Sequence, residues 1–128
     1  MSKRTVVAAG VLAVAGLVAT SAPAWASGSA THRCDYDTSF CFTPTSTVSA
    51  TGTVWGDYAL WGPSGTGVIQ INFHPPGDQY WYYRNVNFDA NRTDGTLSMG
   101  TVPAGSEVYT VVTVQNATHA MLAGWHQD

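Results

Sequence analysis

The sequence predicts an all-β fold, a small single-domain antiparallel sandwich or barrel, for the part of the chain after residue 26. Runs rich in Val, Ile, Tyr, Trp, Phe and Thr alternate there with turn residues at intervals of about ten residues, which is typical of short strands. No stretch in this part repeats apolar residues at the spacing of an amphipathic helix. The 128 − 26 = 102 residues are enough for one domain with one core.

The first residues have the three parts of a secretory signal. Lys3 and Arg4 form a basic start, residues 6–18 are apolar and uncharged, and Ala24-Trp25-Ala26 has small residues where a signal peptidase cleaves. The apolar run is shorter than the roughly 20 residues that cross a bilayer. We therefore expect residues 1–26 to be a cleaved signal peptide and the protein to be secreted.

Residues 27–38 are expected to form a flexible N-terminal segment, because they begin with small polar residues that have little to bury. Residues 39–128 are expected to form the single β domain. Turns are signalled by Pro and Gly at 62–65, 75–78 and 103–105, and by Asp94-Gly95. The expected strands are 39–43, 53–61, 67–74, 79–88, 107–115 and 119–125, with a shorter one at 96–99.

The charge of the expected mature chain limits its partners. Residues 27–128 contain three Arg, no Lys and eight Asp or Glu, so the formal balance is 3 − 8 = −5. A basic stripe is the electrostatic footprint of nucleic-acid binding, and anionic membranes attract polybasic segments. The charge therefore argues against nucleic acid and against a membrane surface, and leaves a protein or a polysaccharide as the expected ligand.

Two cysteines, Cys34 and Cys41, remain after the expected cleavage. An oxidising destination favours a disulfide between them, which would close an eight-residue loop and contribute about 2.5 kcal/mol on the chain-entropy model. A free reactive pair or a bridge between chains is the alternative.

Alternation within the strands assigns side chains to faces. In 67–74, Ile69, Ile71 and Phe73 are expected on the inner side. The outward positions of several strands combine aromatic rings with amides. If those strands are neighbours, they form a recognition face; otherwise the rings are packing for the core and loops. The candidate binding residues are Trp55, Trp61, Asn72, His74, Trp81, Tyr83 and Asn85.

Signatures of catalysis and of metal binding are weak. The chain has no Gly-x-Ser-x-Gly motif, and its acids are scattered through turns, so we predict no catalytic residue and no cofactor. The segment from Asp89 to Gly95 has oxygen ligands but lacks the glycine position and the final glutamate of an EF-hand. We expect an Asp-Gly turn there and no metal site.

The Ala-rich signal ending in Ala24-Trp25-Ala26 and the close pair Cys34…Cys41-Phe42 resemble small secreted β-proteins of actinobacteria. These include peptidase inhibitors and killer-toxin-like proteins of the βγ-crystallin type. The resemblance covers about ten residues of motif. The cysteine spacing here is one residue longer than in the inhibitors, and the Pro and Gly between the cysteines are absent. The resemblance implies a bacterial secreted protein and carries over no reactive-site residue.

Small size, export, one disulfide and many aromatic residues together favour a non-enzymatic recognition protein that binds a macromolecule, such as a hydrolase inhibitor or an antimicrobial protein. One alternative is a carbohydrate- or cell-wall-binding module that uses Trp55, Trp61, Trp81 and Tyr83. Another is a small secreted hydrolase that uses His74 with a carboxylate such as Asp78.

Overall fold

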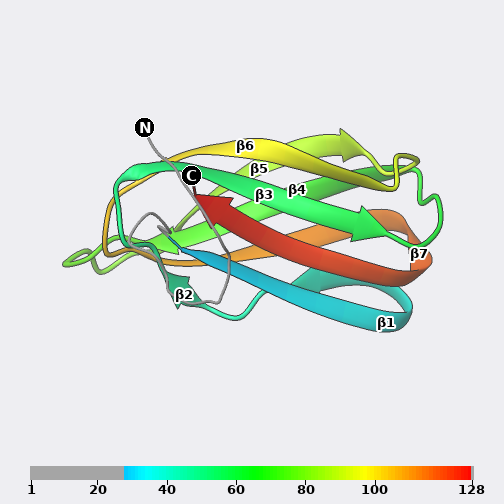
Figure 1. Ribbon diagram of the computed structural model, residues 1–128, viewed down its shortest axis with the longest axis horizontal. Coiled ribbons are helices and arrows are strands. Elements are labelled where there is room, and N and C mark those ends of the chain that lie inside the picture. Colours follow the sequence, from blue (N-terminus) through cyan, green and yellow to red (C-terminus); the bar gives the residue numbers. More distant parts are fainter. Residues whose placement is uncertain (1–27, 128) are drawn as a thin grey trace, which may run out of the picture.

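The computed structural model describes residues 28–127, and its regular elements are all strands (Figure 1). The all-β prediction is therefore confirmed, whereas the expected signal peptide lies outside the described residues. Within 28–127 there is no helix with the length and hydropathy to cross a bilayer. The strands are β1 (Ser29–Phe42), β2 (Ser46–Thr47), β3 (Gly52–Leu60), β4 (Thr66–His74), β5 (Tyr82–Asp89), β6 (Asp94–Val102) and β7 (Glu107–Gln127).

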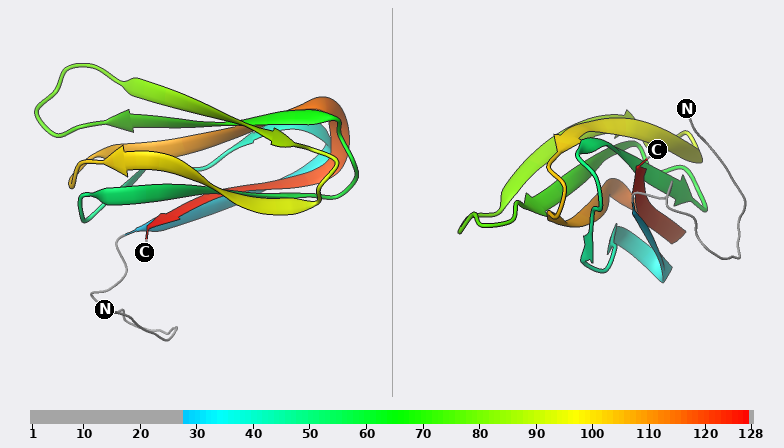
Figure 2. Two further views of the ribbon diagram at one scale, coloured as in Figure 1. Left: turned by 90° about the horizontal axis from the view of Figure 1, so that it is seen from above. Right: turned by 60° about the vertical axis from the view of Figure 1, so that its left-hand side comes forward.

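The longest strand, β7, organises the sheet. The strands are joined in the order β5-β4-β7-β3-β6, and β1 and β2 also pair with β7. Residues 107–114 of β7 pair with β4, and residues 121–127 pair with β3. β1 follows β7 through both parts, and its register shifts between Asp35 and Phe40. β1 and β7 bend together there, so the antiparallel sheet curls into a nearly closed barrel (Figures 1 and 2).

The bend divides the sheet into two layers that enclose the core. The first layer contains β5, β4, the start of β7 and the end of β1. The second contains β6, β3, the end of β7 and the start of β1. The inner side of β4 is the one that alternation predicted. Ile69, Ile71 and Phe73 are buried, while the residues between them are only partly covered. The largest fully buried side chains include Trp125, Ile69, Ile71, Met99 and Met121.

Arg84 joins the two layers where the sheet remains open. Its Nη1 donates hydrogen bonds to the carbonyl oxygens of Met99 (3.0 Å) and Thr101 (2.9 Å) on β6. Its guanidinium also lies over the Phe73 ring, 4.7 Å from the ring centroid. Gly100, at φ +87°, leaves room for this side chain, because a Cβ there would lie 2.6 Å from Nη1. Arg84 thus supplies to β6 the hydrogen bonds that a neighbouring strand would otherwise make.

We expect Arg84→Met to lower the free energy of unfolding by about 1–3 kcal/mol, since it keeps the apolar stem but removes two charge-assisted hydrogen bonds. Urea denaturation followed by far-ultraviolet circular dichroism measures the change. Arg92→Met, in the exposed 91–93 part of the turn, is the matched control and should change stability by less than about 0.5 kcal/mol. Equal effects of the two substitutions would contradict this role of Arg84.

The structure differs from the expected flexible segment at 27–38, since β1 begins at Ser29. Its early residues are mostly exposed, so no apolar pattern marks them. Backbone pairing with β7, from Ser29 opposite His126 to Asp35 opposite Ala120, holds this part instead. An edge strand with polar side chains resembles a loose tail in sequence.

The predicted disulfide between Cys34 and Cys41 is present, with the two Cα atoms 5.8 Å apart. Cys34 lies opposite Met121 and Cys41 opposite Val112, so the two cysteines belong to the two arms of β1 on either side of the bend. The bridge therefore fixes the point at which β1 passes from one layer to the other.

Candidate functional site

The outer side of the first layer brings aromatic rings and amides together across three strands. Asn72 of β4 lies opposite Tyr83 of β5 on one side and Tyr109 of β7 on the other. In the next outward row, Gln70 lies opposite Asn85. We call this surface the aromatic–amide face, and define it by Gln70, Asn72, His74, Trp81, Tyr83, Asn85 and Tyr109.

The amides on β4 are oriented by one another. Asn72 Nδ2 donates a hydrogen bond to Gln70 Oε1 at 3.1 Å. This leaves Asn72 Oδ1 and Gln70 Nε2 as an acceptor and a donor with no hydrogen-bond partner in the described part of the chain. The neighbouring Asn85 side chain is exposed. The face therefore offers hydrogen-bonding groups of both kinds to a ligand.

Trp81 is fixed at one end of this face although 47% of it is exposed. Its indole stacks on the His74 imidazole, with ring centroids 5.2 Å apart and planes 18° apart. On another side it meets the Tyr109 ring at 5.6 Å and 58°. Tyr83, by contrast, is 65% exposed. The face thus presents one ring that its neighbours hold in place and one that stands in solvent.

His74 is held by hydrogen bonds at both ring nitrogens. Nδ1 lies 3.1 Å from Glu107 Oε1, and Nε2 lies 2.6 Å from the Asp78 carbonyl oxygen. A carboxylate and a carbonyl are both acceptors, so the two bonds form together only when both nitrogens carry protons. The hydrogen bond to Glu107 is the main factor that raises the pKa of His74 above its ordinary value. The His74 imidazolium on β4 therefore binds the 75–81 turn through the Asp78 carbonyl and β7 through Glu107, and Trp81 stacks on it.

This arrangement predicts a pH dependence. Because the folded-state pKa of His74 is raised, its contribution to stability is complete below the unfolded value of about 6.5 and is lost as pH rises through the folded pKa. We expect the melting temperature of the wild type to exceed that of His74→Gln by more at pH 5.5 than at pH 9. A difference between the two proteins that does not change with pH would contradict the doubly bonded imidazolium.

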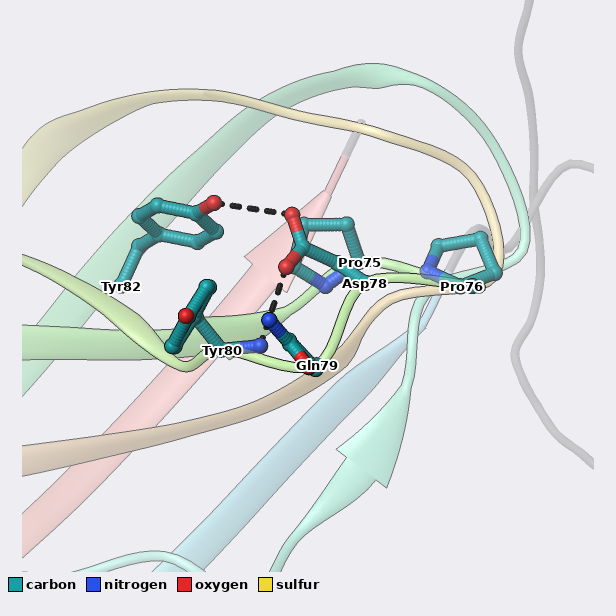
Figure 3. A pocket seen from close by; sticks show the side chains of 7 residues that line it. Pro75, Pro76, Asp78, Gln79, Tyr80 and Tyr82 are labelled. Atoms are coloured by element: carbon teal, nitrogen blue, oxygen red, sulfur yellow. Dashed lines mark hydrogen bonds between the residues drawn. The ribbon is translucent and has the colours of Figure 1, made fainter.

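Asp78 orders the turn that precedes β5 (Figure 3). Its Oδ1 accepts a hydrogen bond from the Tyr80 backbone N–H at 2.9 Å, and its Oδ2 accepts one from the Tyr82 hydroxyl at 2.8 Å. The bond from the Tyr80 N–H, followed by that from Tyr82, lowers the pKa of Asp78, and the same carboxylate raises the pKa of Tyr82. An open hollow of about 580 Å³ is lined by residues 75–80 of this turn and by Tyr82. Both oxygens of Asp78 are therefore engaged in building the turn.

The outer side of the first layer has an apolar edge at β1. Phe42 of β1 lies opposite Val111 and Phe40 lies opposite Thr113, so both extend the outer rows of β7. The two phenyl rings are exposed and stack on each other, with centroids 6.3 Å apart. The sequence shows the alternation of Phe40 and Phe42 but not the long-range pairing with β7 that makes them an edge of this surface.

Two of the candidate binding residues lie elsewhere. Trp55, on the outer side of β3, pairs with Ser98 of β6 and His126 of β7 in the second layer. Trp61 follows β3, and the Arg33 guanidinium covers its ring at 4.4 Å. A single face that includes every candidate aromatic residue required β3, β4 and β5 to be neighbouring strands. β7 separates β3 from β4, so Trp55 and Trp61 do not belong to that face. The other five, Asn72, His74, Trp81, Tyr83 and Asn85, lie on the aromatic–amide face.

Trp61 contributes to a separate hollow at the bend. This hollow, of about 480 Å³, is also lined by Arg33, Asp35, Asp37 and His119. Arg33 Nε donates to Asp35 Oδ1 at 2.8 Å, and His119 Nδ1 lies 3.3 Å from Asp37 Oδ1. The charged groups are therefore paired with one another, in contrast to the uncharged centre of the aromatic–amide face.

The turn expected at Asp94-Gly95 lies instead at residues 90–93, because β5 ends at Asp89 and Asp94 and Gly95 already pair with β3 as the start of β6. Asp89 Oδ1 accepts a hydrogen bond from the Asn91 N–H at 3.0 Å, and Asn91 Oδ1 accepts one from the Gly65 N–H at 3.1 Å. These two side-chain oxygens thus bind the chain's own backbone. In the part of the chain that is described, no three metal-ligating side chains of His, Cys, Asp or Glu gather into a metal-binding group.

No protein-family model, curated protein or solved structure matches this chain.

Proposed function

We propose that this chain is a secreted, non-enzymatic recognition domain that binds a macromolecule through the aromatic–amide face. The observation that carries the proposal is the row Tyr83–Asn72–Tyr109, in which an amide stands between two aromatic rings on the outside of three paired strands. Aromatic rings with a polar handle give a large contact area at a small cost in conformational entropy.

Rigidity of the face supports the same function. Trp81 is held by its contacts with His74 and Tyr109, and Asn72 is oriented by Gln70. Groups that are already ordered lose little freedom when a ligand binds, so more of the contact energy remains as affinity. An exposed indole that only filled space would not need such support.

The geometry of His74 favours recognition over the alternative of a small hydrolase. A general base needs a free nitrogen lone pair, whereas both ring nitrogens of His74 face acceptors. The Asp78 carboxylate, which would be its partner, instead binds the Tyr80 N–H and the Tyr82 hydroxyl. These residues therefore have a structural role in the turn.

Secretion is supported by the disulfide and by the expected signal. A bridge between Cys34 and Cys41 persists in an oxidising compartment and is rare in a reducing one. An exported protein also meets macromolecules, such as secreted enzymes and cell-wall polymers, that the aromatic–amide face can bind.

Two assays on one set of variants test the proposal. The first measures retention on insoluble polysaccharides, and the second measures inhibition of secreted proteases and amylases. The face variant is Tyr83→Ala with Asn85→Ala, and the control is Tyr36→Ala, whose side chain is 94% exposed at the bend. We expect the wild type to respond in at least one assay, the face variant to lose that response about tenfold or more, and the control to retain it.

Absence of any wild-type response in both assays would contradict the proposal. So would a face variant that is as active as the wild type. Thermal unfolding of each variant shows that a lost response does not come from a lost fold.

A further inference from the structure

We infer that the ligand of the aromatic–amide face is a neutral polysaccharide whose chain lies across the strands. The inference rests on the proposed function and specifies the class of molecule that this face binds. Three features of the face support it: its charge, its hydrogen-bonding groups, and the order in which polar and apolar side chains follow one another across it.

The face has no net charge to offer. The imidazole of His74 at one end of the face pairs with the neighbouring carboxylate of Glu107 at 3.1 Å. The three arginines of the described chain lie elsewhere: Arg33 covers Trp61, Arg84 binds β6, and Arg92 is in the turn before β6. An anionic polymer would need these cations on the face, because phosphate or carboxylate groups are bound mainly by Arg and Lys. A neutral ligand is the complement of a neutral surface.

The hydrogen-bonding groups suit hydroxyls. Asn72 Oδ1 is left as an acceptor and Gln70 Nε2 as a donor, two residues apart on one side of β4. Each hydroxyl both donates and accepts, so adjacent hydroxyls of a sugar ring can use such a pair without leaving a group unsatisfied. Asn85, opposite Gln70 on β5, extends the same row of amides.

The rings are placed for stacking. Tyr83, which is exposed, and Tyr109, which is half-buried against Trp81, lie two strands apart in one row, which corresponds to about 10 Å at the ordinary spacing of strands. Sugar rings present C–H surfaces that pack on aromatic planes, and their hydroxyls then point sideways to the amide between the two tyrosines. The row runs across β5, β4 and β7, so a bound chain would lie perpendicular to the strands.

The arrangement of polar and apolar groups favours a polysaccharide over a protein ligand. The core of a protein interface is more apolar than its rim. Here the amides Asn72 and Gln70 lie on the middle strand, while the exposed apolar rings, Phe40 and Phe42, lie at the β1 edge. That order is the reverse of a typical protein interface.

The test is retention of the full secreted protein on insoluble cellulose, chitin, mannan and β-1,3-glucan, with soluble neutral oligosaccharides as competitors. Tyr83→Ala removes the exposed ring, and Asn72→Asp places a negative charge between the tyrosines with almost no change of shape. Tyr36→Ala is the control for loss of an exposed tyrosine, and Asp94→Asn, on β6 in the second layer, is the control for a single change of charge away from the face.

We expect retention of the wild type on at least one of these polymers, release by its soluble oligosaccharide, and about tenfold weaker retention of Tyr83→Ala and Asn72→Asp. Both controls should be retained as the wild type is. Failure of the wild type to bind any of the polymers overturns the inference. If Tyr83→Ala then abolishes inhibition of a secreted hydrolase, the face binds protein and the proposed function survives. Equal retention of wild type and Tyr83→Ala overturns both.

Discussion

Trp125→Ala should lower the free energy of unfolding by about 3–5 kcal/mol, which is a large part of the stability of a small domain. The side chain of Trp125 is 0% exposed, and its strand β7 pairs with β1 on one side and β3 on the other, where Ala30 and Gly56 lie opposite it. Small neighbours make room for this ring, and they cannot fill the cavity that its removal leaves. The loss therefore combines the transfer of apolar surface with an unfilled cavity.

Urea denaturation followed by far-ultraviolet circular dichroism measures this effect without relying on tryptophan fluorescence. Trp61→Ala is the matched control, because Trp61 is 42% exposed and the Arg33 guanidinium covers its ring. That variant should lose no more than about 1 kcal/mol. Similar losses in the two variants would contradict the larger contribution of the buried Trp125 to packing.

The double variant Cys34→Ala with Cys41→Ala should lose about 2–4 kcal/mol of stability. The chain-entropy contribution of so short a loop accounts for about 2.5 kcal/mol. Because the bridge joins the arms of β1 in the two layers, its loss also loosens the bend next to Thr38. Thermal unfolding of the oxidised wild type and of the double variant compares their melting temperatures.

The matched control is the reductant itself. Dithiothreitol should bring the wild type to the melting temperature of the double variant and leave the double variant unchanged. If oxidised wild type and double variant unfold at the same temperature, the bridge does not hold the bend.

Local patterns in the sequence were sufficient for most strands and their faces. Alternation in 67–74 placed Ile69, Ile71 and Phe73 inside, and these side chains are buried. The 75–78 turn likewise follows the end of β4. These features depend on neighbours in the chain, which a single sequence displays directly.

Features that depend on long-range pairing could not be predicted in the same way. β7 is one bent strand rather than the expected pair at 107–115 and 119–125, because β1 bends beside it and maintains the pairing. Expected strand residues 79–81 instead belong to the turn that Asp78 and His74 organise. Pairing partners decide both outcomes, and they are far apart in sequence.

The candidate site was predicted in part for the same reason. Alternation put Asn72, Tyr83 and Asn85 on outward faces, and the register of β4 with β5 brings them together. It also put Trp55 and Trp61 outward, but the topology places β3 in the other layer. Tyr109 completes the row on β7, and only the pairing of β4 with β7 shows that it does.

The central claim is that aromatic rings of the first layer stand in solvent as a binding surface, and acrylamide quenching of tryptophan fluorescence tests it most directly. Comparison of the wild type with Trp81→Phe and with Trp125→Phe gives the quenching of each indole by difference. The structure predicts that the signal lost in Trp81→Phe is readily quenched, whereas the signal lost in Trp125→Phe is shielded. A Trp81 indole as shielded as that of Trp125 would contradict the account.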